Sequence, residues 1–381
     1  MAHNKSHDAP IKIRNEGICS VIPFVHVMTQ KGKGYAPAEE NQTIWHAPGL
    51  FDPETGERIK SEGGVSRYQD VFGDVLLDLA KMNPSVVGIT PAMASGCGMN
   101  KLAKEMPDRF YDVGIEEEHA VTFSAGLAAG GMKPFCNIYS SFSQRAYDQL
   151  IHDVAMQGLP VVLCLDRGGL VGEDGATHHG CYDMAVYRTI PGAVVAAPKD
   201  EIELKDMMYS AMKSETGPYI IRYPRGNGEG VDWKEHDFTE MDAGKGELLL
   251  EGTDVAVICA GPVANRAVEA AIKMKAEKGW NPSIYNIRYI KPLDTVLVAQ
   301  AAASHKRIVT VEDGCVTGGL HAAVTEFLSS GSDLKPVRAV GIPDVYVSQG
   351  TQEELRRECG LTSDTLYCIF EEENEKNFKK D

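Results

Sequence analysis

The sequence lacks any apolar stretch long enough to cross a bilayer. An early apolar segment, residues 18–28, is interrupted by Ser20, Pro23 and His26. It has no small-residue cleavage site and runs into a Lys/Gly turn, so it does not have the pattern of a signal peptide. These absences argue against a membrane protein and predict a cytoplasmic location.

Positive charge is scarce, because 38 Lys and Arg face 54 Asp and Glu and the formal net charge is −16. A chain this acidic is a poor candidate for binding nucleic acid or an anionic membrane, so any phosphate site must be built from a few aimed cations. The nine cysteines include no C-x-x-C pair and no run with zinc-ligand spacing. We therefore expect reduced, mostly buried thiols and no metal site in this chain.

What the sequence does contain is an alternation of short apolar runs and longer Ala-rich helical patterns. Over residues 65–227 this alternation predicts one α/β domain with a parallel sheet covered on both faces. Apolar recurrence every four residues predicts an amphipathic helix over 142–155, and 201–214 is predicted to form another. The predicted strands are Val86–Ile89, Phe110–Val113, Phe135–Tyr139, Val161–Leu165, Val194–Ala196 and Tyr219–Tyr223.

A second α/β alternation predicts a smaller parallel-sheet domain over 245–381, after an aperiodic linker, residues 226–254. Its predicted strands are Val255–Ala260, Ser283–Ile287, Ile308–Val311 and Val337–Val340, with helices over 262–278 and 319–328. Residues 1–64 fit neither domain. Their one candidate strand, Phe24–Thr29, has no predicted partners, so we expect a poorly ordered remnant of a further domain.

Polar and aromatic residues gather where four predicted strands end, in segments 112–122, 139–149, 166–180 and 222–226. Ligands of open α/β sheets bind at the carboxyl ends of the strands, so these segments predict a site. The first two also have ordinary explanations. In the first, a helix dipole can account for one or two of the three Glu residues, and in the second Phe142 can be core and Arg145 solvated surface. The adjacent His178 and His179 are poorly spaced to share a metal ion.

Together these segments resemble the 1-deoxy-D-xylulose-5-phosphate synthases, thiamine-diphosphate enzymes of the transketolase superfamily. The matching stretches are 88–93, 114–122, 139–149, 167–180, 222–228 and 347–354, and the resemblance runs from about residue 24 almost to the C-terminus. It implies the condensation of pyruvate with D-glyceraldehyde 3-phosphate to 1-deoxy-D-xylulose 5-phosphate and CO₂, which feeds isoprenoid, thiamine and pyridoxal synthesis. It also implies a dimer.

The resemblance assigns roles by position. Glu117 matches the acid that contacts N1′ of the cofactor's aminopyrimidine and thereby activates the thiazolium, and Phe142 matches the aromatic that stacks on that ring. Ile115 matches a further cofactor contact. His46 and His178 match catalytic histidines, and the residues that match substrate contacts are Tyr139, Arg145, Arg167, Asp174 and Arg225.

One departure from the family is plain, because the Gly-Asp-Gly motif that holds the diphosphate and Mg²⁺ is absent. The nearest strings, Glu173-Asp174-Gly175 and Glu312-Asp313-Gly314, lack the preceding Gly and the downstream Asn. We therefore expect the Mg²⁺ ligands on another chain or a missing domain, and no activity from this chain alone. The alternatives are a subunit of a split transketolase, a 2-oxoacid dehydrogenase beta-like chain, or an inactive pairing partner. The loop 166–180 argues against the first two.

Overall fold

The computed structural model describes residues 28–42, 44–46, 49, 51–52, 54–58, 64–331 and 335–378. The chain divides into two compact units, residues 1–63 and 64–381. In the first, the described residues include α1 (Ala36–Glu40), the 3-10 turn η1 (Ile44–His46) and a cluster of Tyr35, Trp45 and Phe51. Of the predicted strand Phe24–Thr29, residues 24–27 lie outside the described residues, and Met28 and Thr29 are not in a strand.

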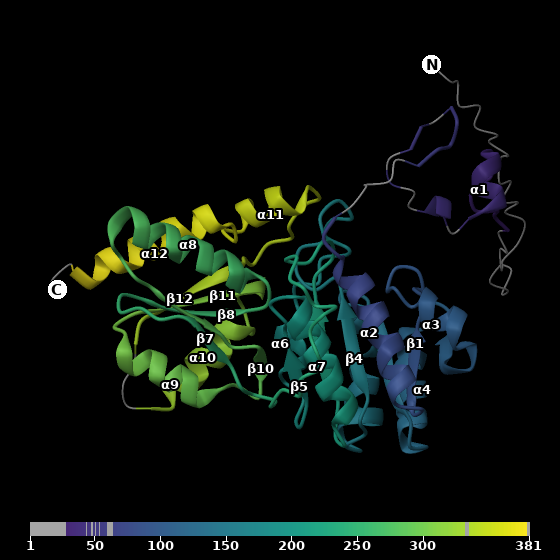
Figure 1. Ribbon diagram of the computed structural model, residues 1–381, viewed down its shortest axis with the longest axis horizontal. Coiled ribbons are helices and arrows are strands. Elements are labelled where there is room, and N and C mark those ends of the chain that lie inside the picture. Colours follow the sequence, from purple (N-terminus) through teal and green to yellow (C-terminus); the bar gives the residue numbers. More distant parts are fainter. Residues whose placement is uncertain are drawn as a thin grey trace, which may run out of the picture. The chain divides into compact units, whose positions relative to one another are not determined.

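Among the described residues of the second unit, seven strands form one sheet and five form another (Figure 1). In spatial order the first sheet contains β10 (Tyr289–Lys291), β5 (Val194–Ala196), β6 (Tyr219–Tyr223), β4 (Val162–Asp166), β3 (Lys133–Tyr139), β1 (Val86–Thr90) and β2 (Phe110–Asp112). The second contains β12 (Val337–Ile342), β11 (Ile308–Cys315), β8 (Ala256–Ala260), β9 (Ser283–Asn286) and β7 (Glu247–Leu250). The prediction of two α/β domains is confirmed.

Helices cover both faces of each sheet because alternate residues of every buried strand point to opposite sides. One face of the first sheet packs on α2 (Tyr68–Met82) and α7 (Glu201–Lys213), with α3 (Asn100–Glu105) beside them. The other face packs on α4 (Glu117–Ala129) and α6 (Asp183–Tyr187). That core continues into one face of the second sheet, with α9 (Thr295–Ser304) and α10 (Leu320–Ser329), so the two sheets share a core.

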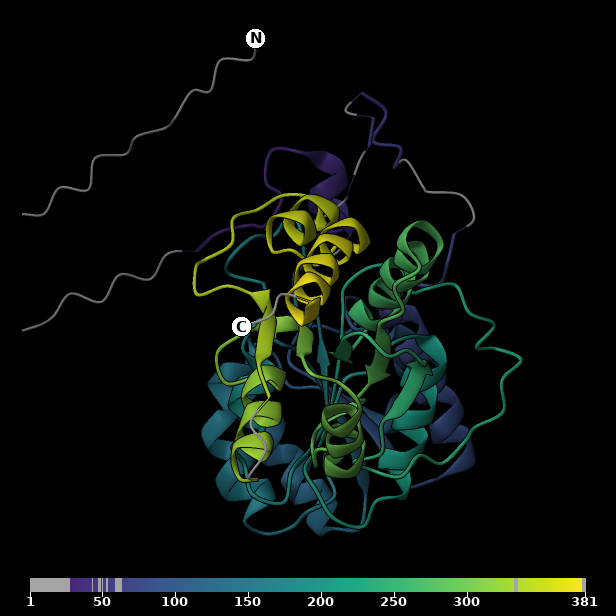
Figure 2. The same cartoon turned by 90° about the vertical axis from the view of Figure 1, so that its left-hand side faces the viewer.

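The opposite face of the second sheet packs on α8 (Val263–Lys278), α11 (Gln352–Glu358) and α12 (Ser363–Phe378) (Figures 1 and 2). Local sequence sets where several of these helices begin and end. Asp200 caps α7, Asp294 caps α9, and Thr351 with Glu354 forms a capping box at α11. Gly279 ends α8 in the left-handed conformation, at φ 71°.

Three details differ from the sequence-based predictions. Each sheet has one antiparallel edge strand, β10 on β5 and β7 on β9, where parallel strands alone were expected. The predicted linker contains β7, and its earlier part lies along α7, where Lys205 donates to the carbonyl oxygen of Trp233. The predicted helix 142–155 is a 3-10 turn, one short α turn (α5, Tyr147–Gln149) and a π-helix (η4, Leu150–Ala155).

Within the described residues, no helix combines the length and the apolar character needed for a membrane span.

Candidate functional site

The four segments predicted from the sequence meet where the parallel strands of the seven-stranded sheet end, which we call the sheet edge below. They follow β2, β3, β4 and β6, which run parallel, and β3, β4 and β6 end at the same level, with Tyr139 paired to Asp166 and Asp166 paired to Tyr223. The parallel order of the strands therefore assembles residues that are up to about a hundred positions apart in the chain. This is the arrangement expected for ligand binding in an open α/β sheet.

Glu117 begins α4 and is almost fully buried, with 3% of its surface exposed. Its Oε1 accepts a 2.7 Å hydrogen bond from Nη1 of Arg145, whose side chain is half exposed. Ile115, two residues earlier, is 79% exposed in the turn that precedes the helix. The turn requires Gly114 at φ 80°, and its backbone N–H donates to Asp112. The site thus has one buried carboxylate paired with one accessible cation.

Aromatic rings lie directly beside that ion pair. Tyr139 and Phe142 stack with centroids 5.7 Å apart, and the rings of Phe142 and His178 meet edge-on with centroids 5.2 Å apart. The Arg145 guanidinium lies 5.1 Å from the centroid of Phe142, and that of Arg167 lies 3.6 Å from the centroid of Tyr139. These cation–π contacts hold two arginines against a half-buried aromatic wall.

Asp166 and Arg167 form a buried charged pair beside these aromatic rings. Burial raises the pKa of Asp166 to about 6, although the positive charge of Arg167 opposes that shift. Arg167 Nη1 lies 3.0 Å from Asp166 Oδ2, yet neither carboxylate oxygen accepts a well-aligned hydrogen bond. The contact is therefore mainly a charge interaction. Arg167 also adopts φ 65°, a left-handed conformation that is unusual for a side chain of its size.

The fourth segment brings Arg225 to the loop that follows β4, residues 166–180, which we call the acceptor loop after the role that the family resemblance implies. Its Nη1 donates to the carbonyl oxygen of Val171 at 2.6 Å and to Glu173 at 2.9 Å, and it lies 3.4 Å from Asp174. Both carboxylates are substantially exposed, so they can rotate toward solvent when an anion approaches the guanidinium. The structure thus brings Asp174 and Arg225 together.

His46 belongs to the unit formed by residues 1–63, where it ends η1, so its position is described only within that unit. The other predicted site residues all lie at the sheet edge. Their catalytic roles are predictions.

Sequence reasoning missed a buried ionic connection beneath the site. Asp183 Oδ2 accepts hydrogen bonds from Arg222 Nε and Ser140 Oγ, both at 2.9 Å. Arg222 Nη2 also donates to the carbonyl oxygen of Asp313, from the second sheet, at 2.9 Å. Each member of this network lies in a different part of the sequence, so only the position of Arg222 at a strand end could have suggested it.

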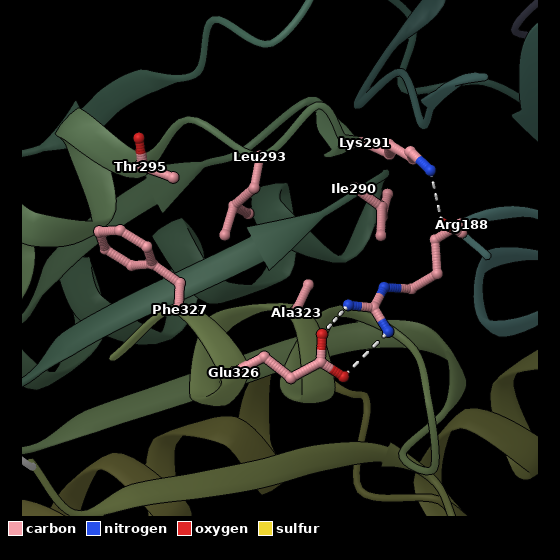
Figure 3. Close-up of a pocket in the computed structure, with 8 residues that line it drawn as sticks. All are labelled: Arg188, Ile290, Lys291, Leu293, Thr295, Ala323, Glu326 and Phe327. Atoms are coloured by element: carbon pink, nitrogen blue, oxygen red, sulfur yellow. Dashed lines mark hydrogen bonds and ion pairs between the residues drawn. The ribbon is translucent and has the colours of Figure 1, made fainter. Parts of the chain in front are cut away.

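A cavity of about 440 Å³ lies away from these strand ends, between β10 and the helices α9 and α10 (Figure 3). Its charged groups already have partners: Arg188 is paired with Glu326, and the ammonium group of Lys291 donates to the carbonyl oxygens of Arg188 and Ile190. Burial lowers the pKa of Lys291. The cavity is therefore lined by four apolar side chains, by Thr295 and by charged groups that already have partners.

The described residues contain no cluster of three or more His, Cys, Asp or Glu that could hold a metal ion. They do offer features that fit an aminopyrimidine ring. Glu117 supplies a buried hydrogen-bond acceptor, and Phe142 supplies a partly exposed aromatic face close to it. The fit thus covers the pyrimidine part of thiamine diphosphate and does not extend to a metal-bound diphosphate.

Comparisons with known proteins agree with this geometry. Residues 66–230 match the family model "Transketolase, pyrimidine binding domain", and residues 244–366 match "Transketolase, C-terminal domain". The 1-deoxy-D-xylulose-5-phosphate synthase of Bacteroides thetaiotaomicron is 52% identical over 90% of this chain and 53% of its own length. That of Phocaeicola vulgatus is 51% identical over 91% of this chain and 55% of its own length. The chain spans about half the length of the curated relatives it matches.

A solved structure described as "Split gene transketolase, inactive beta4 tetramer" has the same fold, with a TM-score of 0.73 and 28% identity. The match covers 82% of this chain and 99% of that one. The two family models together match well over half of the chain, and the relatives share about half of their aligned residues with it. The chain therefore belongs to the transketolase family, as a relative of its 1-deoxy-D-xylulose-5-phosphate synthases.

Proposed function

We propose that the chain provides the pyrimidine-binding and acceptor-binding parts of a 1-deoxy-D-xylulose-5-phosphate synthase. The reaction joins pyruvate to D-glyceraldehyde 3-phosphate and releases CO₂. The observation that carries the proposal is the convergence of Glu117, Phe142, His178 and Arg225 at one sheet edge. The names of the curated relatives support the choice of substrates.

Thiamine diphosphate is the proposed cofactor, and when bound it supplies the carbon nucleophile that adds to a 2-oxo acid. Glu117 would accept a hydrogen bond from N1′ of its pyrimidine. Arg145 holds one oxygen of this carboxyl, which leaves the other oxygen to hold a proton at that nitrogen. Phe142 would support the face of the same ring. Ile115, exposed beside Glu117, is a further proposed contact.

The acceptor's phosphate is proposed to bind the arginines. Arg167 lies at the start of the acceptor loop and Arg225 bonds to its middle, and Arg145 keeps further N–H donors beyond the one that bonds Glu117. A guanidinium binds phosphate oxygens with two parallel hydrogen bonds, so even an acidic chain can hold a phosphate locally. Tyr139, Asp174 and His178 would contact the remainder of the substrates, with His178 as a proton donor or acceptor.

We propose that the ligands of the diphosphate and of Mg²⁺ come from outside the described residues. Residues 1–64 are proposed to connect this chain to the domain that carries them. Residues 65–227 and 245–381 are the proposed pyrimidine-binding and C-terminal domains. We propose a homodimer, or pairing with a chain that carries the diphosphate-binding domain. His46 is a proposed catalytic residue of such an assembly. A cytoplasmic location accompanies the proposal, because the free thiols of the described cysteines suit a reducing compartment.

A second candidate is a subunit of a split transketolase. The solved structure with TM-score 0.73 favours it, since its title describes a split gene product and almost all of that chain is covered. The two candidates differ in substrate, because a transketolase transfers a two-carbon ketol unit and consumes no pyruvate.

The deciding experiment is a product assay on the chain with thiamine diphosphate and Mg²⁺, alone and mixed with a polypeptide carrying the diphosphate-binding domain. The proposal predicts 1-deoxy-D-xylulose 5-phosphate and CO₂ in equal amounts from pyruvate and D-glyceraldehyde 3-phosphate in the mixture. Ketol transfer from xylulose 5-phosphate without pyruvate turnover would favour the second candidate.

A further inference from the structure

The acceptor loop contains a fully buried dipeptide, Leu170-Val171, whose backbone polar groups are all bonded by side chains. The Leu170 N–H donates to Asp313 Oδ1 at 3.3 Å, and the Leu170 carbonyl accepts from Gln352 Nε2 at 2.8 Å. The Val171 N–H donates to His179 Nδ1 at 3.1 Å, and the Val171 carbonyl accepts from Arg225 at 2.6 Å. Buried backbone groups are normally paired with other backbone, so a dipeptide satisfied by four side chains depends on where those side chains stand.

Two of the four partners come from the second sheet and its helices. Asp313 lies in β11, and Gln352 is the first residue of α11, held there by the capping box of Thr351 and Glu354. The approach is close, because a Cβ on Gly169 would lie 2.1 Å from Asp313 Oδ2. Asp313 belongs to one of the two Asp-Gly strings noted in the sequence, and its carboxylate here bonds the acceptor loop.

Gln352 makes a second bond with the same amide group. Its Nε2 donates to the carbonyl oxygen of Arg225 at 3.1 Å as well as to Leu170, so both amide hydrogens are engaged. One side chain thereby connects the backbone of the acceptor loop to the backbone of the residue that reaches across it. The guanidinium of Arg225 in turn donates to the carbonyl oxygen of Val171, so Arg225 is bonded through both its backbone and its side chain.

His179 adds a further tie to the segment before α11. Its Nδ1 accepts from Val171, so its Nε2 carries the proton and donates to the carbonyl oxygen of Ser348 at 3.1 Å. His179 is 4% exposed, whereas the neighbouring His178 is half-buried against Phe142. Of the two adjacent histidines, one therefore anchors the loop and the other faces the site.

We propose that Gln352 is a positioning residue of the acceptor site, which sets the location of the Arg225 guanidinium relative to Asp174 and His178. The name acceptor site rests on the proposed function, whereas the role of Gln352 in holding the loop and Arg225 does not depend on it. The segment 348–352 thus links the second sheet to the side of the site where we propose that phosphate binds.

The test uses Gln352→Met, which keeps the length of the side chain and removes both donors. Gln352→Glu is a second variant, which also lacks donors and suits the first turn of a helix, so at least one should fold normally. Gln300→Met, at an exposed position of α9 on the opposite face of the second sheet from α11, is the matched control.

The first readout is amide hydrogen exchange of the whole chain. Leu170 and Val171 should exchange at least about tenfold faster in both Gln352 variants, because unpaired buried carbonyls destabilise the closed loop. Exchange in α7 and the melting temperature should stay as in the wild type. Unchanged exchange at residues 170–171 would overturn the inference whether or not the chain proves to be an enzyme.

The second readout is kinetic, in the active assembly. The KM for D-glyceraldehyde 3-phosphate should rise about tenfold while kcat changes less than about twofold, and the KM for unphosphorylated D-glyceraldehyde should stay constant. A parallel loss of kcat and melting temperature would show a merely structural role and would overturn the assignment. Absence of turnover in the wild type counts against the proposed function alone, and hydrogen exchange then decides the inference.

Discussion

Arg145 donates a 2.7 Å hydrogen bond to Glu117 across 28 positions of the chain. The bond joins the first turn of α4 to the 3-10 turn after β3, and the same guanidinium lies beside the ring of Phe142. A buried carboxylate is costly unless it is paired, and Arg145 supplies that partner for Glu117, which is 3% exposed. The pair also leaves the second carboxylate oxygen for another donor.

Glu117→Gln tests the proposed role of that carboxylate. The amide is nearly the same size but carries no charge and cannot hold a proton at the cofactor's N1′. Exchange of the thiazolium C2 proton, followed by NMR in the assembled enzyme, should slow by at least about a hundredfold. Glu116→Gln changes an exposed neighbour and should leave the exchange rate near the wild-type value. Near-normal exchange in Glu117→Gln would remove Glu117 from the mechanism.

Arg225→Ala tests the proposed phosphate contact. Loss of one charge-assisted hydrogen bond costs about 1.5–3 kcal/mol, so the KM for D-glyceraldehyde 3-phosphate should rise about 10- to 150-fold. The KM for unphosphorylated D-glyceraldehyde should change much less. Arg357→Ala, which removes a 66% exposed guanidinium from α11, serves as the control. Equal effects on the two aldehydes would exclude a phosphate contact at Arg225.

Asp166→Asn tests the pKa shift beneath the site. Burial raises the pKa of Asp166 to about 6, whereas an unfolded Asp titrates near about 3.9. The unfolded chain thus loses this proton first, and the wild type loses stability as the pH rises from about 4 to about 6. Relative to the wild type, Asp166→Asn should gain about 2–3 kcal/mol over that interval, measured by urea unfolding at each pH.

A second buried acid gives a pH effect of the same sign. Burial raises the pKa of Glu312 to about 7, although the backbone N–H groups of His321 and Leu320 oppose the shift. Because Glu312 is present in both proteins, its effect cancels in the difference between Asp166→Asn and the wild type. A pH-independent difference would show that Asp166 titrates normally.

Asp183→Asn tests the buried connection beneath the site. The Asp183–Arg222 pair is almost completely buried, and removing one partner leaves the other charge uncompensated. The free energy of unfolding should fall by about 3–5 kcal/mol in urea titrations. Asp364→Asn breaks an exposed pair with Lys273 and should cost less than about 1 kcal/mol. Similar costs at both positions would contradict the account of the buried pair.

The sequence predicted most of the fold because its strands are short, continuous apolar runs at strand-like spacing. It missed β10 because Tyr289–Lys291 is only three residues long and pairs with a strand nearly a hundred positions away. It missed β7 because Glu247–Leu250 lies on an edge within a charged segment. Long-range pairing and edge exposure leave little local signal.

The helix predicted over 142–155 shows a different limit. Its four-residue apolar recurrence is real, but the backbone widens, with Met156 N–H donating to Ile151 and Leu159 N–H to Val154 in i→i+5 bonds. Periodicity identified the buried face without fixing the helix type.

The candidate site was predictable only in part. The strand-end positions and the family resemblance identified Glu117, Phe142 and Arg225. The pairing of Arg145 with Glu117 and the ties from Gln352 and Asp313 depend on side chains brought together by folding. Gln352 lies in a segment that matched the family, but nothing in the sequence indicated what its amide would bond.

The most direct test of the central claim is a ¹³C NMR analysis of the product from [2-¹³C]pyruvate and D-glyceraldehyde 3-phosphate. The chain would be assembled with a polypeptide carrying the diphosphate-binding domain, in the presence of thiamine diphosphate and Mg²⁺. The account predicts label in the keto carbon of 1-deoxy-D-xylulose 5-phosphate, formed by the wild type and lost in Glu117→Gln. An assembly that binds thiamine diphosphate and leaves pyruvate unconsumed would contradict it.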